Sequence, residues 1–221
     1  MKDKPTKSTK SFNPLPHLIG AVLLFALGVL LSRGPNLPSW ESSLFLSIYN
    51  TPDSFHKIGL FITQLGDRYI LLVVLLAALL LRKWRMTIFM FLAGLTTYIT
   101  AGLAKALFGR DRPHELIPNV IPLDQFNGPG FPSGHTAFAV VLALSLGLFI
   151  GRRYFLLLAL WILAVAWSRI YLGVHLPADI IGGFAIGWFI YALLKWLEPL
   201  VYDRFIFRTH KENAKESTTN N

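Results

Sequence analysis

Six apolar stretches constrain the fold of this chain more than any other feature. They cover residues 17–32, 58–81, 86–107, 135–150, 154–167 and 178–197, and Gly66-Asp67-Arg68 interrupts the second. Several are shorter than the ~20 residues that a full membrane span requires, so each alone could be a buried helix of a soluble protein. Together they exclude that class, because the only charged residues between 69 and 108 are Arg82, Lys83, Arg85 and Lys105. We predict an all-α polytopic membrane protein with six transmembrane helices.

Clusters of Lys and Arg between these stretches predict the orientation. The formal net charge is +9, but the basic residues do not form one continuous face, which argues against nucleic acid as a partner. Cytoplasmic loops of membrane proteins are enriched in Lys and Arg. The N-terminal tail, the turns at 82–85 and 151–153, and the C-terminal tail all fall on one side of a six-helix arrangement. Both termini are therefore expected in the cytoplasm.

The same pattern predicts the domain organisation. Residues 1–16 are polar and basic and are expected to form a disordered cytoplasmic tail. Residues 17–200 form the six-helix membrane domain, with the first apolar stretch retained as an anchor, and residues 201–221 form a polar cytoplasmic tail. The chain has no cysteine, which excludes disulfides and thiolate chemistry.

The segment between the first two apolar stretches carries large apolar side chains at helical spacing. They are Trp40, Leu44, Phe45, Ile48 and Tyr49. Such a pattern is typical of an amphipathic helix that lies at a membrane interface. An ordinary covering loop explains it equally well, because aromatic residues are common at membrane boundaries.

Three polar clusters lie on the outer side of this arrangement. They are the segment from Lys105 to Arg112-Pro113, the segment Pro132-Ser133-Gly134-His135, and the group of Arg169, His175 and Asp179. Each alone has a simple structural explanation: basic side chains that reach the lipid headgroups, a helix N-cap, and an acid in the first turn of a helix. Three partly desolvated cations beside two helix N-termini, however, call for an anion, because unpaired charge is costly at membrane depth. A phosphate group satisfies them together, whereas a metal ion among three other cations is disfavoured.

Two histidines beside a bound phosphate would divide the chemistry between them. His175 has Asp179 within possible hydrogen-bond reach, and an orienting carboxylate suits a nucleophile that attacks phosphorus. His135 has no obvious acidic partner in the sequence. It is the better candidate for the general acid that protonates the leaving oxygen and for the base that later activates water.

These residues resemble the complete signature of the type 2 phosphatidic acid phosphatase and vanadium haloperoxidase superfamily. The matching elements are Lys105-x6-Arg112-Pro113, Pro132-Ser133-Gly134-His135 and Ser168-Arg169-x5-His175-x3-Asp179, and the resemblance covers about residues 60–197. It implies that His175 is the nucleophile, Asp179 its partner and His135 the acid. It also implies phosphate binding by Lys105, Arg112, Ser133, Gly134 and Arg169, without a metal ion or other cofactor.

Within that superfamily, six helices with an outward site resemble the bacterial membrane-bound lipid phosphatases. These include phosphatases of phosphatidylglycerophosphate, undecaprenyl pyrophosphate and lipid A. The resemblance implies a location in the bacterial cytoplasmic membrane, a site on the extracytoplasmic side, and a phospholipid or polyprenyl phosphate as substrate. Many undecaprenyl pyrophosphatases of the bacitracin-resistance type carry Asp where this chain has Gly134, which argues mildly against that subgroup.

Two other functions stay open on the sequence. A phosphotransferase would pass the phosphoryl group from His175 to a second lipid and not to water. A non-catalytic lipid-binding or transport protein would keep the phosphate site without turnover.

Overall fold

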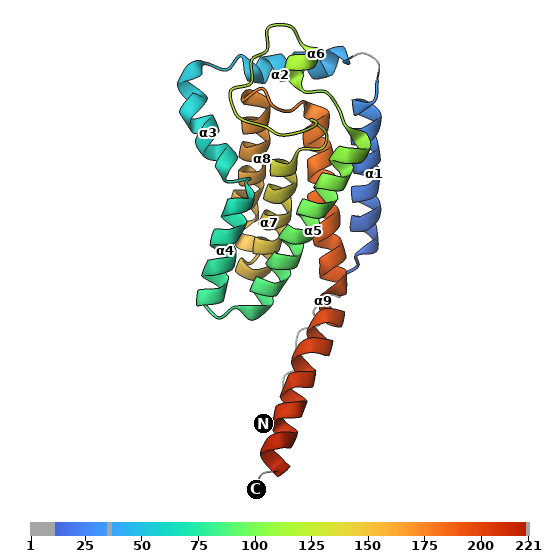
Figure 1. The fold of residues 1–221 in the computed structure, drawn as a ribbon, viewed down its shortest axis with the longest axis vertical. Coiled ribbons are helices and arrows are strands. Elements are labelled where there is room, and N and C mark those ends of the chain that lie inside the picture. Colours follow the sequence, from blue (N-terminus) through green and yellow to red (C-terminus); the bar gives the residue numbers. More distant parts are fainter. Residues whose placement is uncertain (1–11, 35–36, 220–221) are drawn as a thin grey trace.

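The computed structural model describes residues 12–34 and 37–219, which form helices and no strands. Most of the predicted disordered tail, residues 1–11, lies outside the described residues. The helices are α1 (Leu15–Ser32), α2 (Ser39–Tyr49), α3 (His56–Gln64), α4 (Arg68–Leu80), α5 (Trp84–Phe108), α6 (Pro113–Leu116), α7 (Gly134–Ile150), α8 (Phe155–Tyr171) and α9 (Pro177–Thr219), with short 3-10 turns at Asp53–Phe55 and Arg152–Tyr154. Figure 1 shows them as a bundle from which the end of α9 projects. The predicted all-α class is confirmed.

Three helical segments are long and apolar enough to cross a membrane alone: Leu15–Ser32, Trp84–Leu116 and Pro177–Pro199. The second apolar stretch of the sequence becomes α3 and α4, which are bent by 50° at Gly66-Asp67-Arg68 and together make a fourth candidate span. The apolar helices α7 and α8 have 17 residues each and fall below the length of a full span. The six predicted spans therefore correspond to three clear candidates, one broken candidate and two short helices.

Large apolar side chains cover the outer surface of the bundle. Leu30 on α1, Leu80 on α4, Leu107 on α5 and Leu156 on α8 are each at least 70% exposed. A soluble domain rarely exposes so many large hydrophobic residues in one belt, whereas lipid tails solvate them. The chain is an integral membrane protein.

Close packing of α7 against α9 organises the centre of the bundle. Ala137 and Val141 of α7 pack with Ile186 and Ile190 of α9 in one buried cluster. At Gly187 an added Cβ atom would lie only 2.5 Å from the backbone oxygen of Ala137, so glycine is needed for the two backbones to approach this closely. This contact holds the first turn of α7 against α9.

The same end of the bundle carries the non-spanning elements. α2 and α6 lie across it, opposite the end that carries the turn between α4 and α5 (Figure 1). The segment 39–49, for which the sequence left helix and loop open, is helical, with Glu41 and Phe45 buried and Trp40 and Leu44 exposed. At the other terminus α9 continues to Thr219, so most of the predicted polar tail is helical.

Candidate active site

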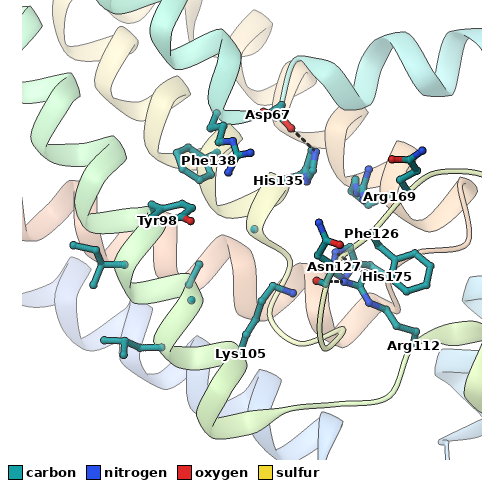
Figure 2. Close-up of a pocket in the computed structure, with 18 residues that line it drawn as sticks. Asp67, Tyr98, Lys105, Arg112, Phe126, Asn127, His135, Phe138, Arg169 and His175 are labelled. Carbon is teal, nitrogen blue, oxygen red and sulfur yellow. Dashed lines mark hydrogen bonds and ion pairs between the residues drawn. The ribbon is translucent and has the colours of Figure 1, made fainter.

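Four helix ends meet beneath α2 and α6 and bring the three polar clusters together. α5 and α8 end here with Lys105 and Arg169, α7 begins here with His135, and His175 lies in the turn between α8 and α9. A cavity of about 710 Å³ opens between them. The candidate residues that line it are Lys105, Arg112, Gly134, His135, Arg169 and His175 (Figure 2). Ser133 and Asp179 are fully buried behind this lining.

His175 is held by Asp179 from the side away from the cavity. Its Nδ1 lies 3.2 Å from Asp179 Oδ2, which also accepts a hydrogen bond from the backbone N–H of Leu176 at 2.9 Å. The other ring nitrogen, Nε2, lies 3.4 Å from Arg112 and faces the cavity. Burial lowers the pKa of His175 well below 6.5, and the nearby Arg112 and Lys105 charges lower it further. The ring is thus neutral at neutral pH, and when Nδ1 carries the proton its Nε2 lone pair lies on the cavity side, within 3.4 Å of Arg112.

Asp179 belongs to a buried charge network that sequence reasoning missed. Its Oδ1 lies 3.3 Å from Arg110, and Arg110 donates two further hydrogen bonds to Glu41, at 2.9 Å and 2.7 Å. Glu41 also accepts the backbone N–H of Ala178, at the start of α9, at 2.8 Å. Arg110 does not reach toward the headgroups, as the simple structural explanation of its segment implies, because it is buried and paired with two carboxylates. No sequence pattern links Glu41 to the site, since 138 residues separate it from Asp179.

Arg112 and Lys105 are fixed by backbone carbonyl groups of the surrounding loops. Arg112 donates to the oxygens of Val174 at 2.6 Å and Gly128 at 3.1 Å, and its guanidinium stacks 4.6 Å from the centre of the Phe126 ring. Lys105 Nζ donates to the oxygen of Pro129 at 2.5 Å. Neither cation forms an ion pair in the part of the chain that the structure describes. Their charges are available to an anion in the cavity.

Arg169 is almost completely buried and only partly satisfied. It donates to Thr63 Oγ1 at 2.5 Å and to Asp124 Oδ2 at 2.6 Å. Its Nε is buried without a hydrogen-bond partner among the described residues. Buried polar atoms are nearly always hydrogen-bonded, so Arg169 keeps an unused donor in a side chain that lines the cavity. The sequence does not indicate Thr63 and Asp124 as partners of Arg169, because neither belongs to the signature segments.

At the start of α7, Ser133 caps the helix and Gly134 leaves space beside the cavity. Ser133 Oγ caps the helix by accepting the backbone N–H of Thr136 at 3.4 Å, and the Ser133 N–H donates to the backbone oxygen of Asp179 at 2.9 Å. A Cβ atom added at Gly134 would meet nothing within 4 Å and would project into free space beside the cavity. Without a side chain at Gly134, the N-terminus of α7 can be approached from the cavity.

His135 has the acidic partner that the sequence did not reveal. Its Nε2 lies 3.4 Å from Asp67 Oδ2, and both residues line the cavity (Figure 2). Asp67 comes from the bend between α3 and α4. The sequence signal for Asp67 is the polar interruption of the second apolar stretch, which by itself predicts only a break in the helix.

The charges around the cavity suit an anion. Lys105, Arg112 and Arg169 line it, together with Arg68, and Asp67 is the one carboxylate among its described lining residues. In the part of the chain that the structure describes, no group of three or more His, Cys, Asp and Glu side chains is placed to hold a metal ion. A phosphate group fits the positive cavity and the N-terminus of α7.

Comparison with known proteins identifies the family. The family model described as "PAP2 superfamily" matches residues 83–202. The putative undecaprenyl-diphosphatase YbjG of Escherichia coli K12 is 32% identical over 165 residues, which cover 68% of this chain and 79% of that protein. Phosphatidylglycerophosphatase B of the same organism is 42% identical over 74 residues, but the match spans only 32% of this chain and 29% of that protein.

Solved structures agree with this assignment. The crystal structure of Aquifex aeolicus LpxE has a TM-score of 0.65 and 27% sequence identity, with 72% of this chain and 96% of that chain covered. The Bacillus subtilis transmembrane PAP2 type phosphatidylglycerolphosphate phosphatase has a TM-score of 0.70 at 22% identity, with 84% and 97% covered, and shows the same fold. The chain belongs to the PAP2 superfamily.

Proposed function

We propose that this protein is a membrane lipid phosphatase that hydrolyses the terminal phosphate of a lipid phosphate or diphosphate through a phosphohistidine intermediate. The observation that carries the proposal is the placement of His175. Its Nδ1 contacts Asp179, while its Nε2 faces a cavity lined by four cationic side chains and by His135. This arrangement orients a neutral imidazole toward a bound phosphate.

In the first step, Nε2 of His175 attacks phosphorus and the bond to the leaving oxygen breaks. Lys105, Arg112, Arg169 and the N–H groups at the start of α7 stabilise the negative charge on the three equatorial oxygens. His135 gives its proton to the leaving oxygen, which departs as an alcohol or as a lipid monophosphate. Asp179 stabilises the positive charge that develops on the His175 ring.

In the second step, water hydrolyses the phosphohistidine. His135, now unprotonated, takes a proton from the water as its oxygen bonds to phosphorus. The bond between phosphorus and His175 Nε2 breaks, inorganic phosphate leaves, and both histidines return to their starting protonation states. No step draws on a metal ion.

A lipid substrate is supported by the apolar side of the cavity. Tyr98, Ile99 and Leu103 of α5 line it and are more than half exposed on the surface of the bundle. A phosphate in the cationic part of the cavity would thus leave its hydrocarbon tail against α5. The related proteins are named for phosphatidylglycerophosphate, undecaprenyl diphosphate and lipid A, and we propose a substrate of this class.

We also propose six membrane crossings, with the site on the extracytoplasmic side of a bacterial cytoplasmic membrane and both termini inside. The basic turn between α4 and α5 lies at the end of the bundle opposite α2 and α6 (Figure 1), which agrees with the enrichment of basic residues on the cytoplasmic side. The short helices α7 and α8 would be the fourth and fifth crossings.

Phosphate release from the purified protein in detergent tests the function. The panel consists of phosphatidate, phosphatidylglycerophosphate, undecaprenyl diphosphate and lipid A, each with and without EDTA. We expect release from at least one lipid, insensitivity to EDTA, and a loss of at least about 10³-fold in His175→Ala, because removal of a nucleophile leaves only binding and electrostatic catalysis.

The other outcomes separate the alternatives. Transfer of phosphate from one lipid to another without release would assign a phosphotransferase. Binding without turnover in the unaltered protein would assign a lipid-binding protein, and full turnover by His175→Ala would exclude the phosphohistidine.

A further inference from the structure

Asp67 is an unexpected charge in a site for an anion. It is the one carboxylate among the described residues that line the cavity, and it faces the same space as Lys105, Arg112 and Arg169. A second negative charge near a bound phosphate repels it, because the interaction of two unit charges is strong outside bulk water. Such a residue needs a role that offsets this cost.

The position of Asp67 is fixed from several sides. Its Oδ1 accepts the backbone N–H of Tyr69 at 3.1 Å and caps α4, while Oδ2 lies 3.4 Å from His135 Nε2. The bend that carries it is pressed onto α7 and α8: a Cβ atom added at Gly66 would lie 2.5 Å from Val165 and 3.1 Å from the backbone oxygen of His135. Trp161 of α8 donates to the backbone oxygen of Leu65 at 3.2 Å.

Capping alone does not account for the contact with His135. The N-cap uses one carboxylate oxygen, and Ser, Thr or Asn would serve that purpose without a charge. The second oxygen is directed at the imidazole, whose side chain is 27% exposed, while that of Asp67 is 24% exposed. The pair therefore lies at the edge of the cavity, where a proton can be exchanged with a substrate.

We propose that Asp67 is the positioning residue for His135: it orients this histidine as the general acid and favours its protonated form relative to a site without the carboxylate. The inference rests on the proposed phosphatase function. With Nε2–H directed at Asp67, the Nδ1–H of the imidazolium is the group that faces the leaving oxygen. As the bond between phosphorus and that oxygen breaks, Nδ1 gives its proton to the oxygen, and Asp67 stays ionised.

The site thus contains two imidazole–carboxylate pairs of opposite purpose. Asp179 contacts Nδ1 of His175 and leaves Nε2 for phosphorus, whereas Asp67 contacts Nε2 of His135 and leaves Nδ1 for the leaving oxygen. The signature contains Asp179 but not Asp67, which comes from the bend between α3 and α4.

The test compares two leaving groups in Asp67→Asn. Asn keeps the cap of α4 and removes only the charge. Dioctanoyl phosphatidate releases a poor alkoxide leaving group and depends on a general acid, whereas p-nitrophenyl phosphate releases a phenolate that does not. We expect kcat to fall by about 10–100-fold for the lipid, within the range of general acid catalysis, and by less than about 3-fold for the aryl ester.

A pH profile gives the second readout. The charged and titratable groups around His135 are Asp67, Arg68, Lys105, Arg112, Asp124, Arg169 and His175. Since Asp67→Asn removes a negative charge beside the imidazolium, the alkaline limb of kcat for the lipid is expected to move to lower pH. Asp67→Glu, which keeps the charge, is expected to retain the wild-type limb and the wild-type dependence on leaving group.

Asp111→Asn is the matched control, because Asp111 is an exposed carboxylate at the same end of the bundle and does not line the cavity. If kcat of Asp67→Asn fell equally for both esters and its pH profile were unchanged, the proposed role of Asp67 would be overturned and the phosphatase function would stand. Absence of phosphate release by the wild type from either ester would instead overturn the proposed function, and the role of Asp67 with it.

Discussion

At the scale of single residues, the two histidines differ in what surrounds them. His175 is 3% exposed and lies beside Arg112, whereas the side chain of His135 is 27% exposed and lies beside a carboxylate. Burial and neighbouring cations favour a neutral ring, and a neighbouring carboxylate favours a charged one. In the proposed mechanism His175 serves as the nucleophile from the first environment and His135 as the acid from the second.

The low pKa of His175 can be measured without turnover. The measurement is an NMR titration of protein labelled with ¹⁵N-histidine in detergent. The imidazole signals that are missing from the spectrum of His175→Asn belong to His175. We expect them to stay those of a neutral imidazole as the pH falls through 6.5, because burial and the Arg112 and Lys105 charges lower its pKa.

Arg112→Gln supplies the control for that titration. It removes one of these cations, so the His175 ring should titrate at higher pH than in the wild type. A wild-type ring that becomes protonated at or above pH 6.5 would contradict the described environment.

At the scale of elements, the packing of α7 on α9 aligns the two halves of the site. Gly183 and Gly187 of α9 meet the backbone oxygens of Ser133, the N-cap of α7, and of Ala137 in its first turn. His135 and Asp179 are carried on the first turns of these helices, so their separation depends on this contact. The regular stretches of apolar residues predicted both helices, but not that they touch each other at glycine.

Gly187→Ala tests this contact. The added Cβ atom would lie 2.5 Å from the oxygen of Ala137, a backbone atom that cannot move aside alone. We expect a loss of about 1–3 kcal/mol in the free energy of unfolding, typical of overpacking, and a lower phosphatase rate because His135 is displaced. The unfolding temperature in detergent and the phosphate-release assay measure the two effects.

Gly102→Ala is the matched variant for stability. A Cβ atom there would meet nothing within 4 Å, so the substitution should keep or raise the unfolding temperature, since Ala favours helix over Gly. If both substitutions changed the unfolding temperature equally, helix propensity and not the contact between α7 and α9 would determine the change.

At the scale of the whole molecule, one buried charge network connects parts of the chain that are far apart in sequence. Glu41 of α2, Arg110 in the loop after α5, and Asp179 of α9 form ion pairs of 2.7 Å and 3.3 Å around one guanidinium. The network holds α2 over the end of the bundle and at the same time supports the partner of His175.

Removal of Arg110 is expected to weaken the whole fold. In Arg110→Met two buried carboxylates lose their cation, and loss of one partner from a buried ion pair costs about 3–5 kcal/mol. The double variant Glu41→Gln, Arg110→Met should recover part of this loss, because it removes one of the stranded charges. Unfolding of both variants in detergent measures the difference, and an Arg110→Met protein as stable as the wild type would contradict the structural importance of the network.

The sequence by itself determined the helical class, the apolar stretches and the signature residues that line the cavity. It could do so because hydrophobic periodicity and the spacing of signature residues are local properties of the chain. Lys105, Arg112, His135, Arg169 and His175 each lie within a short segment whose helix end could be predicted.

Only the tertiary structure decided which charges meet. Asp67 approaches His135 because the bend between α3 and α4 packs on α7, and Glu41 approaches Arg110 because α2 folds across the end of the bundle. Asp124 likewise reaches Arg169 from a loop. These partners are distant in sequence, and their pairing depends on the close packing of helices that no local pattern records.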